Sequence, residues 1–260
     1  MWGIYIQKIK LTVIYDDLNG VEPGYIKSFG FAAIIELENK KILFDTGTKE
    51  EVLVKNLSKY GLMPSDIDAV ILSHNHYDHA NGLSGILKSN DDVPVYVHKY
   101  WNNSVRHIGD PFPPNNIKVI QKGRRLEELG KKIYVTNCFQ SRDYGGIYEQ
   151  ACYFEAEHSY ILLCGCTHPG LNVFLNDRET LGIPIDKPIH IIGGFHGFKF
   201  DNDRANQLKP YVQSIVIFHC TRNIKTFQSQ FEEKCSIGVV GKSYFFWYRW
   251  NQSNGFCQLL

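Results

Sequence analysis

Short apolar runs bounded by polar turns recur along the chain and predict an alternation of strands and helices. Runs of β-branched and aromatic residues between turn residues are typical of strands, whereas apolar positions three or four residues apart are typical of helices. Strands are predicted at 9–15, 30–37, 40–47, 69–72, 93–98, 132–138, 151–157, 158–170 (running into a turn), 187–197 and 214–221. Helices are predicted at 48–60 with Thr48 as N-cap, 82–89, 171–182 and 225–234.

Residues 99–130 break this alternation. The stretch WNNSVRHIGDPFPPNN is rich in asparagine, proline and aromatic residues and has no clear period. A loop of this length inside a compact domain is commonly a lid or a binding segment, so we predict a lid-like insertion at about 99–130. No linker, tandem repeat or low-complexity tract divides the chain, and residues 1–260 are predicted to form a single domain.

Polar residues follow one apolar strand after another. They are Asp45, the cluster from His74 to His79, His168, His196 and His219. Loops after strand ends are where α/β and sandwich enzymes place their active sites. We therefore expect these side chains to meet in one place if their strands lie in neighbouring positions.

The stretch SHNHYDHANG, at residues 73–82, carries most of this chemistry. His74 and His76 are two residues apart on an extended segment, so their imidazoles point the same way and can hold one metal ion. Asp78 and His79 follow after the chain has begun to turn, and they are placed to hold a second ion or to support the first. Imidazole with carboxylate is a typical set for Zn, Fe or Mn. The alternative is a polar loop that happens to be rich in histidine.

Composition narrows the class of protein. The net charge of the 260 residues is +1, which gives no global field toward nucleic acid or an anionic membrane. No basic segment followed by an apolar stretch, and no transmembrane helix, is visible in the sequence. Seven cysteines form an odd set without regular spacing. We therefore expect a cytoplasmic protein with reduced cysteines that binds neither membrane nor nucleic acid.

The HxHxDH pattern, preceded by a strand and followed by Gly82 and a predicted helix, resembles the signature of the metallo-β-lactamase superfamily. ILFDTG resembles the first motif of that superfamily, and IFHCT resembles its last. CGCTHPG, IIGGFH and FHCT, in this order, resemble a subgroup named for 7,8-dihydropterin-6-methyl-4-(β-D-ribofuranosyl)aminobenzene-5′-phosphate synthase. The resemblance implies an α/β or α+β fold, a four-layer αββα sandwich.

The resemblance also implies a site and a reaction. Two divalent ions are expected, Zn before Fe or Mn, and Asp45 would orient their ligand loop from below. The expected activity is hydrolysis or transfer at a phosphoester of a pterin- or nucleotide-like small molecule, phosphodiesterase-like, by metal-activated hydroxide. Asp78 and His196 would be catalytic, His196 as proton donor or hydrogen-bond partner of the phosphoryl group. The implied ligands are His74, His76 and His168 for one ion and Asp78, His79 and His219 for the other.

The chain departs from these patterns in two places. The Gly-Asp that usually supplies a bridging carboxylate has no counterpart, and Gly165-Cys166 stands in its place. Cys166 is either a thiolate ligand or, the reading we favour, a buried thiol beside the ligands. Arg222 stands where the subgroup has glycine. It and Arg142 are candidate phosphate contacts, and Trp101 is a candidate to stack on a flat ring.

Other functions stay open at this point. A diiron oxidoreductase is disfavoured because His76 stands where such sites usually carry glutamate. A ribonuclease is disfavoured by the near-zero net charge. A binding or sensor protein that keeps a metal but does no chemistry is disfavoured by the complete first cluster, although the missing aspartate keeps it in play.

Overall fold

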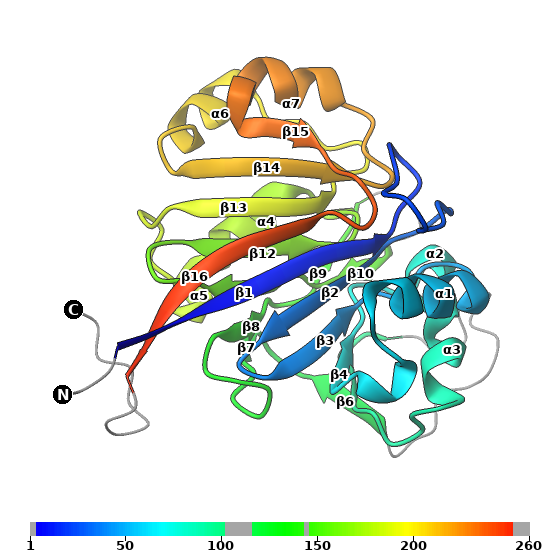
Figure 1. Ribbon diagram of the computed structural model, residues 1–260. Coiled ribbons are helices and arrows are strands. Elements are labelled where there is room, and N and C mark those ends of the chain that lie inside the picture. The colour runs from blue at the N-terminus through cyan, green and yellow to red at the C-terminus, as the bar shows by residue number, and fades with distance from the viewer. Residues whose placement is uncertain (1–3, 102–115, 143–145, 252–260) are drawn as a thin grey trace.

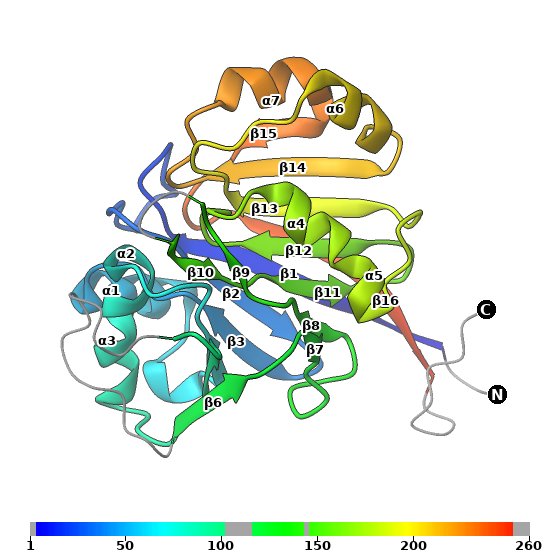
Figure 2. The ribbon, with the colours of Figure 1, turned by 180° about the vertical axis from the view of Figure 1, so that it is seen from behind.

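Two seven-stranded β-sheets pack face to face, and helices cover the outer face of each (Figures 1 and 2). The computed structural model describes residues 4–101, 116–142 and 146–251. The four layers are helices, sheet, sheet and helices. The predicted αββα sandwich is therefore confirmed.

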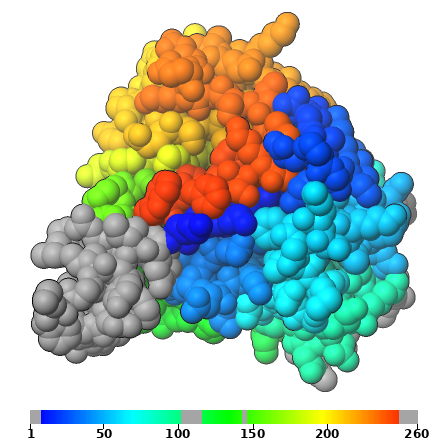
Figure 3. Space-filling view, viewed as in Figure 1, coloured from blue at the N-terminus to red at the C-terminus, as the bar shows by residue number. Residues whose placement is uncertain are grey.

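The first sheet has the order β16-β1-β2-β3-β4-β5-β6. Its strands from β16 to β3 pair antiparallel, and those from β3 to β6 pair parallel. The first and the last described strands thus lie side by side, with β16 along β1 (Figure 3). The bounds are β1 Ile4–Tyr15, β2 Ala32–Leu37, β3 Lys40–Phe44, β4 Ala69–Ile71, β5 Val95–His98, β6 Ile117–Ile120 and β16 Ser243–Asn251.

The second sheet has the order β15-β14-β13-β12-β11-β8-β7. Strands β12 to β15 pair parallel and the others antiparallel. A separate hairpin joins β9 (Phe139–Gln140) to β10 (Tyr148–Glu149). The bounds are β7 Arg124–Arg125, β8 Ile133–Val135, β11 Cys152–Glu155, β12 Tyr160–Cys164, β13 Ile189–Gly194, β14 Val212–Phe218 and β15 Cys235–Ile237.

Helices α1 to α3 lie on the first sheet, and α4 to α7 lie on the second (Figures 1 and 2). None of them, within the described residues, is long and apolar enough to span a membrane. The α-helices are α1 Glu50–Tyr60, α2 Tyr77–Ala80, α3 Ser84–Leu87, α4 Leu171–Asn176, α5 Arg178–Leu181, α6 Asn202–Leu208 and α7 Ile224–Phe231. Short 3₁₀ turns include Pro64–Asp66, Asn81–Leu83 and Glu232–Lys234.

The strands are apolar on both faces because both faces are covered. On β2, Ala33 and Ile35 join the core between the sheets, while Ala32 and Ile34 face the helices on the outside. Successive side chains of a strand point to opposite faces, so a strand buried on both sides reads as a continuous apolar run. This burial explains why runs such as AVIL were visible in the sequence.

The predicted lid at 99–130 needs correction where the structure describes it. Residues 116–130 contain β6 and β7, which are edge strands of the two sheets, and Leu126 and Leu129 are buried in the core between the sheets. Strand β6, with the sequence IKVI, is only four residues long and follows a stretch rich in proline and asparagine, which hid it. Residues 102–115 of the predicted lid lie outside the described residues.

Two smaller predictions also failed. The N-cap of α1 is Lys49 rather than Thr48, because the Thr48 hydroxyl donates to the carbonyl oxygen of Phe29 instead. Helix α6 was missed because its sequence NDRANQL has only two apolar positions. Its N-cap, Asp201, accepts a hydrogen bond from the backbone of Arg204 and was a usable signal.

Candidate metal centre

The polar residues that follow the parallel strands meet at one end of the two sheets. Asp45 follows β3 and His74 follows β4 in the first sheet, while His196 follows β13 and His219 follows β14 in the second. Parallel strands direct their carboxyl ends to the same edge, so neighbouring strands bring these residues together. The prediction that distant strand ends share one site agrees with this arrangement.

His74, His76 and His168 form the first cluster. The ring centroids are 4.7 Å apart for His74 and His76, 4.9 Å for His74 and His168, and 4.8 Å for His76 and His168. The Nδ1 atom of His74 lies 2.8 Å from the hydroxyl of Ser73, which leaves its Nε2 facing the other two rings. Burial, reinforced by the neighbouring imidazoles, lowers the pKa of His76 to about 4 and that of His168 to about 2. Both rings are therefore neutral at pH 7, the form that binds a metal.

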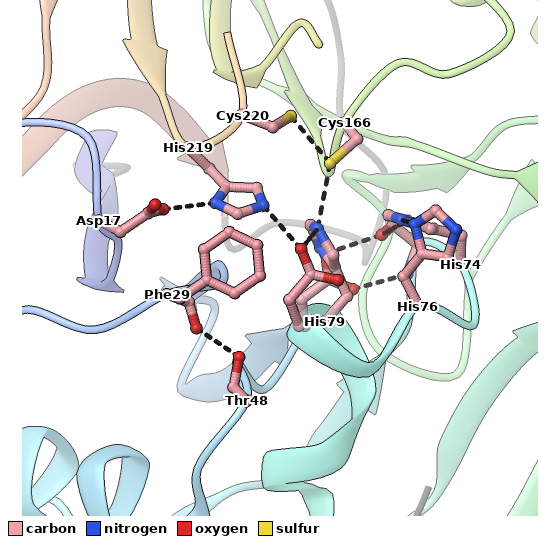
Figure 4. A network of polar contacts seen from close by, with 12 residues as sticks. Asp17, Phe29, Thr48, His74, His76, His79, Cys166, His219 and Cys220 are labelled. Atoms are coloured by element: carbon pink, nitrogen blue, oxygen red, sulfur yellow. Dashed lines mark hydrogen bonds and ion pairs between the residues drawn. The ribbon is translucent and has the colours of Figure 1, made fainter. Parts of the chain in front are cut away.

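Asp78, His79 and His219 form the second cluster. The Oδ2 atom of Asp78 lies 3.0 Å from Nε2 of His219 and 3.8 Å from Nε2 of His79. Each histidine is held from its other nitrogen, His79 by Asp45 at 2.7 Å and His219 by Asp17 at 2.6 Å. Figure 4 shows the ring of His219 between Asp17 and the carboxylate of the second cluster.

The charges around the second cluster favour a cation. Although burial works against the charged form, the carboxylates of Asp17 and Asp78 raise the pKa of His219 to about 10. Burial also works against ionised Asp78, yet His79 and His219 hold the pKa of Asp78 well below its usual range. Positive charge is thus stabilised between these carboxylates, whether a proton or a metal ion carries it.

The two clusters lie side by side, and Cys166 belongs to both. The ring centroids of His74 and His79, one from each cluster, are 4.2 Å apart. The ligand atoms of His74, Cys166 and His168 all lie within 4.8 Å of one another, and so do those of His79, Cys166 and His219. Burial raises the pKa of the Cys166 thiol well above its usual value. The reading of Cys166 as a thiol beside the ligands fits its burial, and its Sγ also lies at ligand distance.

Asp45 anchors both the histidine loop and His79. Its carboxylate accepts hydrogen bonds from the backbone N–H and the hydroxyl of Ser73, both at 2.7 Å, and contacts Nδ1 of His79. The loop after β12 packs directly on this anchor. A Cβ on Gly165 would lie 2.3 Å from the Ser73 hydroxyl and 3.1 Å from Asp45, so only glycine fits there.

Backbone strain gathers at the same place. Of the seven described non-glycine residues with positive φ, four belong to this centre: Asp45 at 56°, Thr167 at 55°, His196 at 39° and His219 at 35°. Such conformations cost about 1–3 kcal/mol each and persist where the surroundings enforce them. Their concentration marks the region as a functional site rather than a polar loop rich in histidine.

Sequence reasoning missed Glu149 and Asp17. Glu149 is fully buried and accepts the backbone N–H groups of Cys166, Thr167 and His168 at 2.8, 2.9 and 2.7 Å. Burial raises the pKa of Glu149 to about 7 although these three donors favour its ionised form. Asp17 had a signal, since the pair Asp16-Asp17 directly follows the apolar strand IKLTVIY. Glu149 had none, because the sequence around it reads as a polar loop, although the structure places it in β10.

A cavity of about 530 Å³ opens beside the first cluster. His168 and His196 line it, with ring centroids 4.7 Å apart, and Arg142 borders it from the β9–β10 loop. Its other walls include Phe139, Pro169, Val173 and Phe198.

The other two predicted substrate contacts do not line this cavity. Arg222 is exposed, and its backbone N–H donates to the carbonyl oxygen of His196 at 2.8 Å. Trp101 packs against the core under the helices of the first sheet, with its ring 5.8 Å from that of His98. Trp101 thus packs on apolar core side chains, and its role as a substrate contact stays a prediction.

Comparison with known proteins agrees with this description. The sequence model of the metallo-β-lactamase superfamily matches residues 26–137. The chain is 26% identical to the 7,8-dihydropterin-6-methyl-4-(β-D-ribofuranosyl)-aminobenzene-5′-phosphate synthase of Methanocaldococcus jannaschii, over 91% of this chain and 96% of that protein.

Two solved structures share the fold. One is a metal-dependent hydrolase of the β-lactamase superfamily, with a TM-score of 0.67 and 23% identity, covering 91% of this chain and 98% of that one. The other is a diphosphatase from the PhnP family, with a TM-score of 0.53 and 12% identity, covering 94% of this chain and 99% of that one. At these identities the likeness concerns the fold.

Proposed function

We propose that this chain, whose residues 26–137 match the sequence model of the metallo-β-lactamase superfamily, is a metal-dependent hydrolase or phosphotransferase acting on a phosphoester. The observation that carries the proposal is the pair of adjacent clusters, which joins five imidazoles and one carboxylate at one end of the sheets. Imidazoles whose far nitrogens are held by a hydroxyl or by carboxylates form a donor set suited to divalent transition metals, since a bound metal would replace the proton on the nitrogen that faces the centre.

The residues divide between two ions. His74, His76 and His168 would hold one, and Asp78, His79 and His219 would hold the other. When bound, the ions would supply Lewis acidity that activates water and stabilises negative charge developing on a phosphoryl oxygen. Zinc suits imidazole and carboxylate ligands well, and Fe or Mn would also fit.

The other residues of the site would orient the ligand rings or donate a proton or a hydrogen bond to the substrate. Asp45 and Asp17 keep the rings of His79 and His219 in one orientation through the nitrogen away from the centre. His196 faces the same cavity as His168, so it can donate a proton to the leaving oxygen or a hydrogen bond to the phosphoryl group. Arg142, at the border of that cavity, can bind a phosphoryl oxygen through its guanidinium.

The cavity walls support a small phosphoester with a flat ring as substrate. Arg142 and His196 supply the polar side, and the rings of Phe139 and Phe198 supply an aromatic side. Aromatic side chains stack on pterins or nucleobases because all of these rings are flat and polarisable. The name of the M. jannaschii relative contains both a dihydropterin and a phosphate ester, which supports the same substrate class.

Turnover of generic phosphoesters tests the proposal. Full-length protein would be stripped of metal, reloaded with Zn²⁺ or Mn²⁺, and assayed with bis-p-nitrophenyl phosphate, p-nitrophenyl phosphate and a pterin phosphoester. We expect turnover of at least one ester only after reloading, and a loss of 100-fold or more in His76→Ala, which lacks a ligand. His158→Ala is the matched control, because that side chain is 81% exposed at the other end of β12.

The proposal fails if the reloaded protein, with its metal content verified, turns over none of these esters. It fails equally if His76→Ala keeps both metal and full turnover. A metal-containing protein that binds a pterin phosphoester without converting it would be a binding or sensor protein instead.

A further inference from the structure

We infer that the Sγ atom of Cys166 is the ligand shared by both metal ions, lying between the two histidine clusters. The inference rests on the proposed function and deepens it. Cys166 is the residue common to the His74–His168 group and the His79–His219 group of ligand atoms, each group within 4.8 Å. Because the neighbouring rings of His74 and His79 are 4.2 Å apart, ions held by the two clusters would also be neighbours.

The position of Cys166 is fixed by its surroundings. The residue is 2% exposed, and its backbone N–H donates to Glu149 at 2.8 Å. Its Sγ lies 3.1 Å from Nε2 of His79, the nitrogen that turns away from Asp45 and toward the centre (Figure 4). The backbone at the preceding Gly165 packs closely against Ser73, so the thiol of Cys166 points toward the centre and not into the surrounding core.

Thiolate chemistry suits this place. A coordinating thiol loses its proton, and the resulting sulfur has enough lone pairs to bind two ions at once. The other candidate ligands are imidazoles and the carboxylate of Asp78. A thiolate would therefore be the second anionic ligand and would offset part of the charge of two dications. Soft thiolate ligands select zinc over hard ions such as magnesium and calcium.

A second thiol lies within hydrogen-bond distance of the first. The Sγ atom of Cys220 lies 3.0 Å from that of Cys166 and can donate a hydrogen bond to it (Figure 4). Cys220 is in neither group of ligand atoms found among the described residues. We therefore assign it as a hydrogen-bond donor that orients and stabilises the thiolate, not as a ligand.

Cobalt substitution tests the assignment without relying on activity. Full-length protein loaded with Co²⁺ would be examined for the near-ultraviolet sulfur-to-cobalt charge-transfer band and for metal content per chain. We expect two ions and the band in the wild type and in Cys235→Ala, which removes a buried thiol of β15 outside the centre. Cys166→Ser should lose the band and at least one ion, and Cys166→Asp should regain two ions without the band. Cys220→Ser should keep the band.

The outcomes separate this inference from the proposed function. If the wild type binds two ions without a sulfur band, Cys166 is not a ligand, although the proposed function survives. If the band survives in folded Cys166→Ser and disappears in Cys220→Ser, the roles of the two thiols are reversed and the inference is wrong. If Cys166→Ser loses the band but keeps both ions in place, Cys166 is a ligand but not a shared one, and the inference is again wrong. A wild type that binds no metal would contradict both the inference and the proposed function.

Discussion

Asp45→Asn should weaken metal binding although Asp45 is not among the proposed ligands. Asparagine has nearly the same shape as aspartate and tolerates positive φ, so the backbone at 56° can be kept. One carboxylate oxygen of Asp45 accepts the backbone N–H of Ser73, and the other contacts the Ser73 hydroxyl and Nδ1 of His79, each at 2.7 Å. An amide can replace only one of these acceptors with an oxygen.

The tautomer of His79 sets the size of the effect. The carboxylate favours a proton on Nδ1 and so leaves Nε2 free to bind a metal. An amide NH₂ facing Nδ1 would instead favour the proton on Nε2. The lost bond between Asp45 and His79 is worth about 1.5–3 kcal/mol, as for hydrogen bonds to charged groups. At about 1.4 kcal/mol per factor of ten, metal affinity should fall by roughly 10- to 100-fold, the range usual for such supporting residues.

Competition with a chromophoric chelator would measure that affinity, and urea unfolding of metal-free protein would measure stability. Asp177→Asn is the matched control. Asp177 is also buried and accepts hydrogen bonds from the backbone and side chain of Asn137, but it contacts no candidate ligand. Both variants should lose a similar amount of stability, and only Asp45→Asn should lose metal affinity. Equal metal affinity in wild type and Asp45→Asn would refute the reasoning.

Three further predictions concern other parts of the molecule. Gly165→Ala should lower the free energy of unfolding, measured in urea, by about 1–3 kcal/mol and should lower the metal content, because its Cβ would lie 2.3 Å from the Ser73 hydroxyl. Gly20→Ala is the control and should change neither quantity, because its Cβ would lie 3.8 Å from its nearest neighbour. Burial lowers the pKa of His190 to about 4, so its contribution to stability is complete above pH 6.5 and is lost as the pH falls toward 4. In metal-free protein, His190→Gln should reduce this acid-induced loss of unfolding free energy by about 2–3 kcal/mol, and an unchanged pH slope would contradict the assignment. Arg142→Ala should raise KM for a phosphoester roughly tenfold with a smaller change in kcat, Arg142→Lys should restore part of the loss, and an unaltered KM would remove Arg142 from the substrate site.

The strand ends that carry the candidate ligands were accessible from sequence for one physical reason. Strands buried on both faces must be apolar throughout, so an abrupt change to Asp or His marks the strand end clearly, as at Asp45, His74 and His219. Since parallel strands end at a common edge, these residues were expected to meet before any distance was known.

The features that were missed depend on contacts that leave no local pattern. The burial of Glu149 follows from the loop carrying Cys166 and His168 folding over it, and a glutamate in a stretch that reads as a polar loop gives no sign of that. Edge strand β6 is too short for its alternation to stand out beside a proline-rich stretch. The place of Cys166 between two clusters arises only when strands of both sheets converge.

Elemental analysis of untagged, full-length protein would show whether the two clusters hold metal. We expect two divalent ions per chain in the wild type and fewer in His76→Ala. A wild-type protein that retains no ion, and takes up none when Zn²⁺, Mn²⁺ or Fe²⁺ is supplied, would contradict this expectation.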